Sequence, residues 1–191
     1  IVISIVAGEQ HADSLTKILA PYQLPVFWIK ASKSTCGVIN RYEKPETLGT
    51  DRWAALISAW HLKQHACVVV NAGTAITIDA LSTCEVDGVE SGKFMGGLIL
   101  PGLNLMQQTL GRATAQLPKT KAYHAPAAEL HQDIFAKNTA DAIYNGAIHA
   151  ISGAIEHMAA SLNKQSKQPP QIVISGGDAQ VIANALTYCV T

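Results

Sequence analysis

The chain has 191 residues, which is enough for one or two domains with a buried core. Hydrophobic residues make up 48% and charged residues 15%, and so low a charged share excludes intrinsic disorder and favours extensive burial or an oligomer interface. The 14 Lys and Arg residues balance the 14 Asp and Glu residues, so no basic field drives binding to nucleic acid.

The first half of the chain alternates strands and helices. Residues 1–6 are a β-branched run that predicts a buried strand, 10–20 have the spacing of a short helix, and 25–29 form a second strand, so this β-α-β unit predicts parallel strands. Residues 31–50 have no sustained period, and we interpret them as a long functional loop before a helix at 51–67. The chain lacks an initiator Met, so we expect it to be cut from a longer protein.

The second half has a different order, in which a meander of three strands precedes two helices, a strand and a last helix. We expect strands at 67–71, 75–81, 94–100 and 171–175, a turn or short strand at 86–90, and helices at 103–110, 138–163 and 178–186. Residues 111–137 are interpreted as irregular. Asn138 or Thr139 suits the cap of the long helix, and Asp178 suits the cap of the last one. From this change of order we divide the chain into residues 1–66 and 67–191.

The chain gives no sign of a membrane or secreted protein. No apolar run reaches the ~18 residues that span a bilayer, and residues 1–6 lack the features of a signal peptide. The four cysteines, Cys36, Cys67, Cys84 and Cys189, have neither CxxC nor zinc-site spacing. We interpret them as free thiols of a cytoplasmic protein.

A carboxylate and a guanidinium stand side by side where the loop enters the helix, at Asp51 and Arg52. Asp51 has two interpretations, because Asp is a common helix N-cap and is also a general base when it faces a cleft. In the second interpretation Arg52 grips an anionic ligand.

Three glycine-containing turns are further candidates. Residues 71–79 (NAGTAITID) place a Gly-Thr turn between two strands, where backbone N–H groups and a hydroxyl can approach a phosphate. Residues 96–102 (GGLILPG) and 175–179 (SGGDA) put paired glycines inside a strand and between a strand and a helix. Each also fits a purely structural role, as a hairpin turn, a close packing contact or a plain β-α turn.

Residues 42–53 (YEKPETLGTDRW), followed in order by these three segments, resemble the type III pantothenate kinases, a family that includes Bvg accessory factors. The resemblance extends from about residue 2 to about residue 186. It implies an α/β fold of two RNase H-like halves, as in the acetate and sugar kinase, Hsp70 and actin superfamily, with the first three strands missing from the N-terminal half. It also implies a homodimer that transfers the γ-phosphoryl group of ATP to the primary hydroxyl of pantothenate, the first step of coenzyme A biosynthesis.

The resemblance also assigns roles to residues of this chain. Asp51 would be the general base, and ATP would bind between the halves together with Mg²⁺. The pantothenate pocket would contain Tyr42, Gly49, Thr50, Arg52 and, across the dimer interface, Thr139. ATP would contact Gly73, Thr74, Gly176 and Gly177.

The chain departs from the family pattern in two places. The first phosphate loop, an Asp-x-Gly-Asn-Thr-like turn near the N-terminus, is absent, so we expect this chain alone to bind Mg-ATP poorly. Asn71 stands where many members have an Asp that helps to hold a monovalent cation, K⁺ or NH₄⁺. Asn keeps a carbonyl oxygen but lacks the charge, which predicts a weaker cation requirement.

Two other functions stay open at this point. One is a regulatory or accessory protein that keeps the kinase fold without turnover, and the other is a sugar or acid kinase of the same superfamily. The Asp51–Arg52 pair favours a kinase, because a non-catalytic relative has no chemical need for it. Neither nucleic acid nor a membrane is an expected partner.

Overall fold

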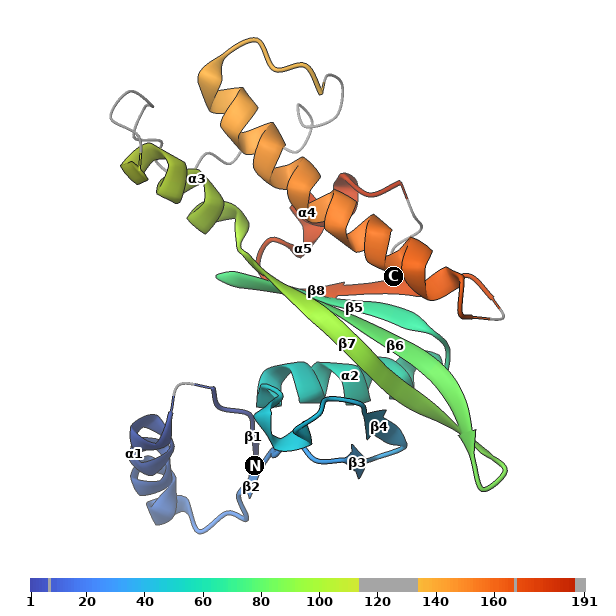
Figure 1. Cartoon of the computed structure of the whole chain (residues 1–191). Helices are drawn as coiled ribbons and strands as arrows, with labels where there is room; N and C mark the ends of the chain where they lie inside the picture. Colours follow the sequence, from blue (N-terminus) through green and yellow to red (C-terminus); the bar gives the residue numbers. More distant parts are fainter. Residues whose placement is uncertain (7, 114–133, 167, 188–191) are drawn as a thin grey trace.

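The computed structural model describes residues 1–6, 8–113, 134–166 and 168–187 (Figure 1). A six-stranded sheet has the order β3-β4-β7-β6-β5-β8, and a separate two-stranded sheet pairs β1 with β2. The strands are β1 (Val2–Ile3), β2 (Phe27–Trp28), β3 (Ser34–Thr35), β4 (Val38–Asn40), β5 (Cys67–Ala72), β6 (Ala75–Val86), β7 (Val89–Pro101) and β8 (Gln171–Ser175). The helices are α1 (Glu9–Leu19), α2 (Thr50–Lys63), α3 (Leu103–Ala113), α4 (Thr139–Asn163) and α5 (Ala179–Asn184), with short 3₁₀ turns at Ala20–Tyr22 and Pro45–Thr47.

The large sheet is covered on both faces, by α2 on one side and by α4 and α5 on the other, while α3 follows the end of β7 and packs against α4 (Figure 1). Side chains of β5 alternate between the two faces, because Val68 and Val70 pack with α4 whereas Cys67 and Val69 pack with α2. A strand buried on both faces reads as a continuous apolar run, which is why residues 67–70 show no alternation of polar and apolar residues.

The predicted meander is confirmed, since β5, β6 and β7 pair antiparallel in sequence order. The expected turn or short strand at 86–90 is confirmed as a turn, at Asp87 and Gly88. It is the tip of one long hairpin, in which Asp87 and Gly88 have φ of 50° and 78°, as a tight Asp-Gly hairpin turn requires. A bulge opposite Ala80 and Leu81 leaves Met95 of β7 unpaired, and the ladder continues on both sides of it.

The interpretation of residues 31–50 as a loop is partly wrong. Residues 31–50 contain β3 and β4. Because β4 pairs parallel with β7, this segment extends the large sheet at its edge. These strands have two and three residues, too short to show a period of two in the sequence. The predicted parallel pairing of the first two strands is confirmed, because β1 and β2 are parallel. The prediction of a buried strand over residues 1–6 is wrong, because β1 covers only Val2–Ile3 and the Val2 side chain is 69% exposed.

The predicted helices differ from the observed ones mainly at their ends. Helix α2 ends at Lys63 rather than at residue 67, because Gln64 adopts a left-handed conformation (φ 46°) that turns the chain into β5. Helix α4 begins as expected, with the Asn138 side chain accepting a hydrogen bond from Asp141 N–H. Helix α5 has six residues, and Asp178 at its N-cap makes no capping hydrogen bond with its side chain.

Three cysteines of the described segments, Cys36, Cys67 and Cys84, are free thiols, in agreement with the sequence analysis. No helix within the described ranges is long and apolar enough to cross a membrane. The division of the chain at residue 66 stays a prediction.

Candidate active site

A buried ion pair joins the start of α2 to the middle of β6. Arg52 Nη2 lies 2.5 Å from Asp79 Oδ1, and Arg52 Nε donates to Asp79 Oδ2 at 3.1 Å. Arg52 Nη1 donates to the Tyr42 hydroxyl at 3.0 Å. Three of the five guanidinium N–H groups therefore donate to internal partners. The two side chains are only 6% and 2% exposed, so the pair is shielded from water.

A glycine on the neighbouring strand makes the space for this pair. Gly97 lies directly opposite Asp79 in the β6–β7 ladder. A Cβ at Gly97 would overlap the Asp79 carboxylate and would lie 2.8 Å from Arg52 Nη2. Glycine is therefore required at position 97, because any side chain there would displace the bidentate pair. The sequence alone does not show this requirement.

Burial and pairing act in opposite directions on the two charges. Burial lowers the pKa of Arg52, but the hydrogen bond and the charge of Asp79, helped by Tyr42, raise it above the ordinary value for arginine. Burial raises the pKa of Asp79, against the hydrogen bond and charge of Arg52, and the Asp51 carboxylate raises it further. Because Arg52 alone opposes these effects, the charge of Asp79 depends on Arg52.

Asp51 lies one residue before Arg52, half-buried in the first turn of α2. It is not the N-cap, because Gly49 occupies that position, and this corrects one of its two interpretations. Its Oδ1 still accepts the Arg52 N–H at 2.8 Å, which fixes the carboxylate beside the helix terminus. Gly49 leaves room for it, since a Cβ there would lie 2.6 Å from Asp51 Oδ1.

The structure thus brings together four of the predicted substrate-pocket residues, Tyr42, Gly49, Thr50 and Arg52, around Asp51. The Thr50 hydroxyl donates to Ile5 O at 3.0 Å and lies 2.9 Å from Ser4 Oγ, so it ties the segment after β1 to α2. The expectation that Arg52 grips an anionic ligand stays a prediction, and its guanidinium already pairs with Asp79. Thr139 lies elsewhere, on the opposite face of the sheet, in an apolar groove of about 710 Å³ between α3 and α4.

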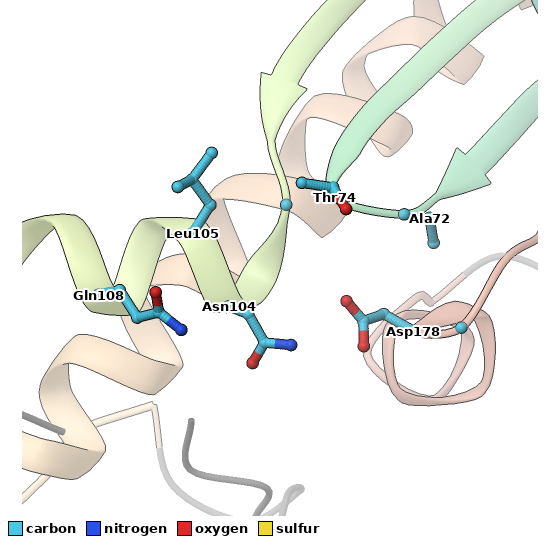
Figure 2. A pocket seen from close by; sticks show the side chains of 9 residues that line it. Ala72, Thr74, Asn104, Leu105, Gln108 and Asp178 are labelled. Carbon is cyan, nitrogen blue, oxygen red and sulfur yellow. The ribbon is translucent and has the colours of Figure 1, made fainter. Parts of the chain in front are cut away.

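A second predicted group, the glycine turns, meets at one end of the sheet around a cavity of about 350 Å³ (Figure 2). Strands β5 and β8 are parallel neighbours, so the turns that follow them lie at the same edge. The lining comes from the β5–β6 turn, the start of α3 and the β8–α5 turn: Ala72, Gly73, Thr74, Gly102, Asn104, Leu105, Gln108, Gly177 and Asp178.

Close backbone contacts hold these turns in place. A Cβ at Gly102 would overlap the Gly73 carbonyl oxygen and lie 2.6 Å from Thr74 O. Gly176 has φ of 105°, and a Cβ there would overlap the backbone of Ala72, so only glycine fits. Gly177 is different, because nothing lies within 4 Å of a Cβ built on it. Of the predicted ATP-binding residues, Gly73, Thr74 and Gly177 line the cavity and Gly176 shapes its wall.

Polar groups reach into this cavity from three directions (Figure 2). Thr74 contributes a hydroxyl, α3 contributes the amides of Asn104 and Gln108, and Asp178 contributes a carboxylate. The Asn104 Oδ1 atom is buried and has no hydrogen-bond partner within the described part of the chain. Sequence reasoning missed Asn104, because an Asn in the first turn of a helix carries no signal of its own.

Asn71, the candidate cation ligand, lies in β5 opposite Thr77 and Ser175 and does not line the cavity. Within residues 1–6, 8–113, 134–166 and 168–187, no three His, Cys, Asp or Glu side chains cluster as a metal site.

Comparison with known proteins identifies the family. The sequence model described as type III pantothenate kinase matches residues 1–161. The chain belongs to the type III pantothenate kinase family. Family members with this name include one from Nitrosomonas eutropha, 44% identical over 96% of this chain and 66% of its own length. Another, from Nitrosospira multiformis, is 43% identical over 94% of this chain and 63% of its own length.

The chain spans about two thirds of the length of these curated relatives. A solved structure from Campylobacter jejuni, described as a Baf-family transcriptional activator, superposes with a TM-score of 0.61 over 95% of this chain and 71% of its own. At 23% identity that likeness concerns the fold alone, and it supports a mixed α/β architecture.

We predict that Gly97→Ala destabilises the protein by about 3 kcal/mol, because the methyl group separates Arg52 from Asp79 and leaves two buried charges without partners. Urea unfolding followed by circular dichroism measures the change. Gly153→Ala is the matched control: Gly153 is exposed within α4 and has open space around it, so alanine there should stabilise the protein by about 0.5–1 kcal/mol. Equal stability of Gly97→Ala and the parent protein would contradict this account of the ion pair.

Proposed function

We propose that the protein is an ATP-dependent pantothenate kinase that phosphorylates the primary hydroxyl of pantothenate to give 4′-phosphopantothenate. The observation that carries the proposal is the Asp51 carboxylate, which is held at the start of α2 beside the Arg52–Asp79 pair. The proposal is also supported by several relatives that are named type III pantothenate kinase and are 38–45% identical to this chain.

Asp51 would act as the general base. One carboxylate oxygen, Oδ1, is committed to the Arg52 N–H, and this leaves Oδ2 to accept the proton of the attacking hydroxyl. The hydroxyl oxygen then bonds to the γ-phosphorus as the bond from phosphorus to the leaving oxygen of ADP breaks. The neutral Arg52–Asp79 pair would serve this step by fixing the first turn of α2.

Pantothenate would bind beside Asp51, against Tyr42, Gly49, Thr50 and Arg52. The two Arg52 N–H groups that Asp79 and Tyr42 do not occupy would donate to the substrate. Thr139 lies on the opposite face of the sheet from Asp51, so it would not join this pocket within one chain. Its contact with pantothenate would require a homodimer in which the second copy supplies Thr139. The apolar groove that contains Thr139 supports such an interface.

ATP would occupy the cavity at the end of the sheet, with its phosphates near Gly73 and Thr74 and its nucleoside near Gly176 and Gly177. Mg²⁺ would arrive with the nucleotide, which supplies phosphate oxygens as ligands. K⁺ or NH₄⁺ would bind near Asn71 with a weaker requirement than an Asp would create. The wider proposal is a cytoplasmic enzyme with two RNase H-like halves.

Pantothenate-dependent release of ADP by the full-length protein tests the function. Asp51→Asn should lower kcat about 10²- to 10⁴-fold, because the amide cannot accept the proton. Asp87→Asn makes the same chemical change at the exposed hairpin tip, where Asn also tolerates the positive φ, and it should leave the rate unchanged. A folded full-length protein that releases no ADP would favour the regulatory function instead.

Alanine substitutions at the two glycines after β8 should have different effects on stability and on ATP binding. Gly176→Ala should destabilise the protein, because its Cβ overlaps Ala72 and its φ is positive. Gly177→Ala should leave the melting temperature unchanged and raise the KM for ATP several-fold, because its methyl group faces open space beside the cavity. If Gly177→Ala binds ATP as tightly as the parent protein, the nucleotide does not occupy this cavity.

A further inference from the structure

The loop that carries Tyr42 is held at its base by the side chain of Asn40. Asn40 is the last residue of β4, lies opposite Phe94 of β7, and is only 4% exposed. Its Oδ1 accepts the N–H of Tyr42 at 3.0 Å, and its Nδ2 donates to Pro45 O at 3.1 Å. One buried amide thus satisfies a backbone donor and a backbone acceptor further along the chain.

These two hydrogen bonds restrain the segment between β4 and the turn that leads into α2. The bond to the N–H two residues ahead is an Asx turn, which mimics a backbone turn and sets the direction of the chain as it leaves the strand. The bond to Pro45 O closes residues 41–44 into a loop, because Pro45 opens the 3₁₀ turn Pro45–Thr47. Asn40 therefore holds this loop at both of its ends.

The restrained loop presents the Tyr42 ring to the charged cluster. The Tyr42 hydroxyl accepts from Arg52 Nη1 at 3.0 Å, and the guanidinium carbon of Arg52 lies 5.7 Å from the centroid of the Tyr42 ring. The same ring lies 5.2 Å from the ring of Phe94. Tyr42 is thus held from two sides, at its backbone by Asn40 and at its ring by Arg52 and Phe94. Loss of the Asn40 side chain would release the backbone side.

We propose that Asn40 is a positioning residue of the substrate pocket, which presets Tyr42 against Arg52 so that the substrate meets a wall that is already formed. This inference rests on the proposed kinase function, in which Tyr42 lines the pantothenate pocket. A loop that must be ordered on binding costs free energy and weakens the observed affinity. Asn40 does not line the cavity proposed for ATP, and its side chain bonds to the loop rather than to Asp51. Its loss should therefore act on pantothenate binding and not on phosphoryl transfer.

The test measures kcat and the KM values for pantothenate and ATP in the full-length protein. Asn40→Ala should raise the KM for pantothenate about 10-fold, the effect of losing about one net hydrogen bond, and should change kcat and the KM for ATP by less than about 2-fold. Asn40→Ser should recover part of this loss, because a serine hydroxyl accepts the N–H two residues ahead more weakly than Asn does. Ile172→Val is the control for stability. It removes one buried methyl group from the opposite face of the sheet, and should lower the melting temperature but keep both KM values.

A double-mutant cycle shows whether Asn40 acts through Tyr42. Tyr42→Ala should itself raise the KM for pantothenate, and the addition of Asn40→Ala should then change it by less than about 2-fold, because the ring to be positioned is already gone. Effects that multiply in the double variant would overturn the inference. So would an unchanged KM for pantothenate in Asn40→Ala, a fall in kcat as large as the rise in KM, or an equal rise in KM in Ile172→Val.

Hydrogen exchange separates this inference from the proposed function. If the parent protein shows no turnover, the proposed function fails, and exchange of the Tyr42 N–H, measured by NMR in the full-length protein, decides the positioning role alone. This N–H should be protected in the parent and should exchange at least about 10-fold faster in Asn40→Ala. The Gln171 N–H, which donates to Ala66 O at 3.0 Å, should keep its rate. Free exchange of the Tyr42 N–H in the parent, or an equal rate in Asn40→Ala, would overturn the inference.

Discussion

The bidentate pair of Arg52 with Asp79 is the constraint on which the site depends. Two charges buried beneath a sheet are costly to desolvate, and they persist because each satisfies the other with good geometry. The pair needs Gly97 for space, Tyr42 for a third hydrogen bond and α2 for the approach of Arg52. These requirements connect four segments far apart in sequence, and the Asp51 carboxylate lies at the point where they meet.

The sheet places this charged cluster and the cavity in different environments. Asp79 is in the middle of β6, on the face covered by α2, whereas Thr74 lies just before that strand at the edge of the sheet. About five residues of extended strand, or ~17 Å, separate them. In the proposed function, the nucleoside would bind at the edge of the sheet and the general base would lie beside the middle of β6.

The sequence predicted the elements whose signals are local. The β5–β6–β7 meander, the long α4 with its Asn138 cap, and β8 follow from apolar patterns and turn residues within a few positions. The short β3 and β4 were missed because pairing with β7, and not their own composition, makes them strands. In the sequence, Asp79 is only the last residue of a turn motif. Its partner is 27 residues away, and neither residue alone shows that the pair forms. Asn104 was missed for the same reason, since only the folded chain turns it toward Asp178.

In the proposed mechanism, the Arg52–Asp79 pair holds Asp51 where it takes the proton of the substrate hydroxyl. A crystal structure of the full-length protein with pantothenate and a non-hydrolysable ATP analogue tests it most directly. We expect an Asp51 oxygen at about 2.6–3.2 Å from the primary hydroxyl of pantothenate, with the Arg52–Asp79 pair intact beneath it. Pantothenate bound away from Asp51, or an Arg52 side chain that has left Asp79 for the substrate carboxylate, would contradict it.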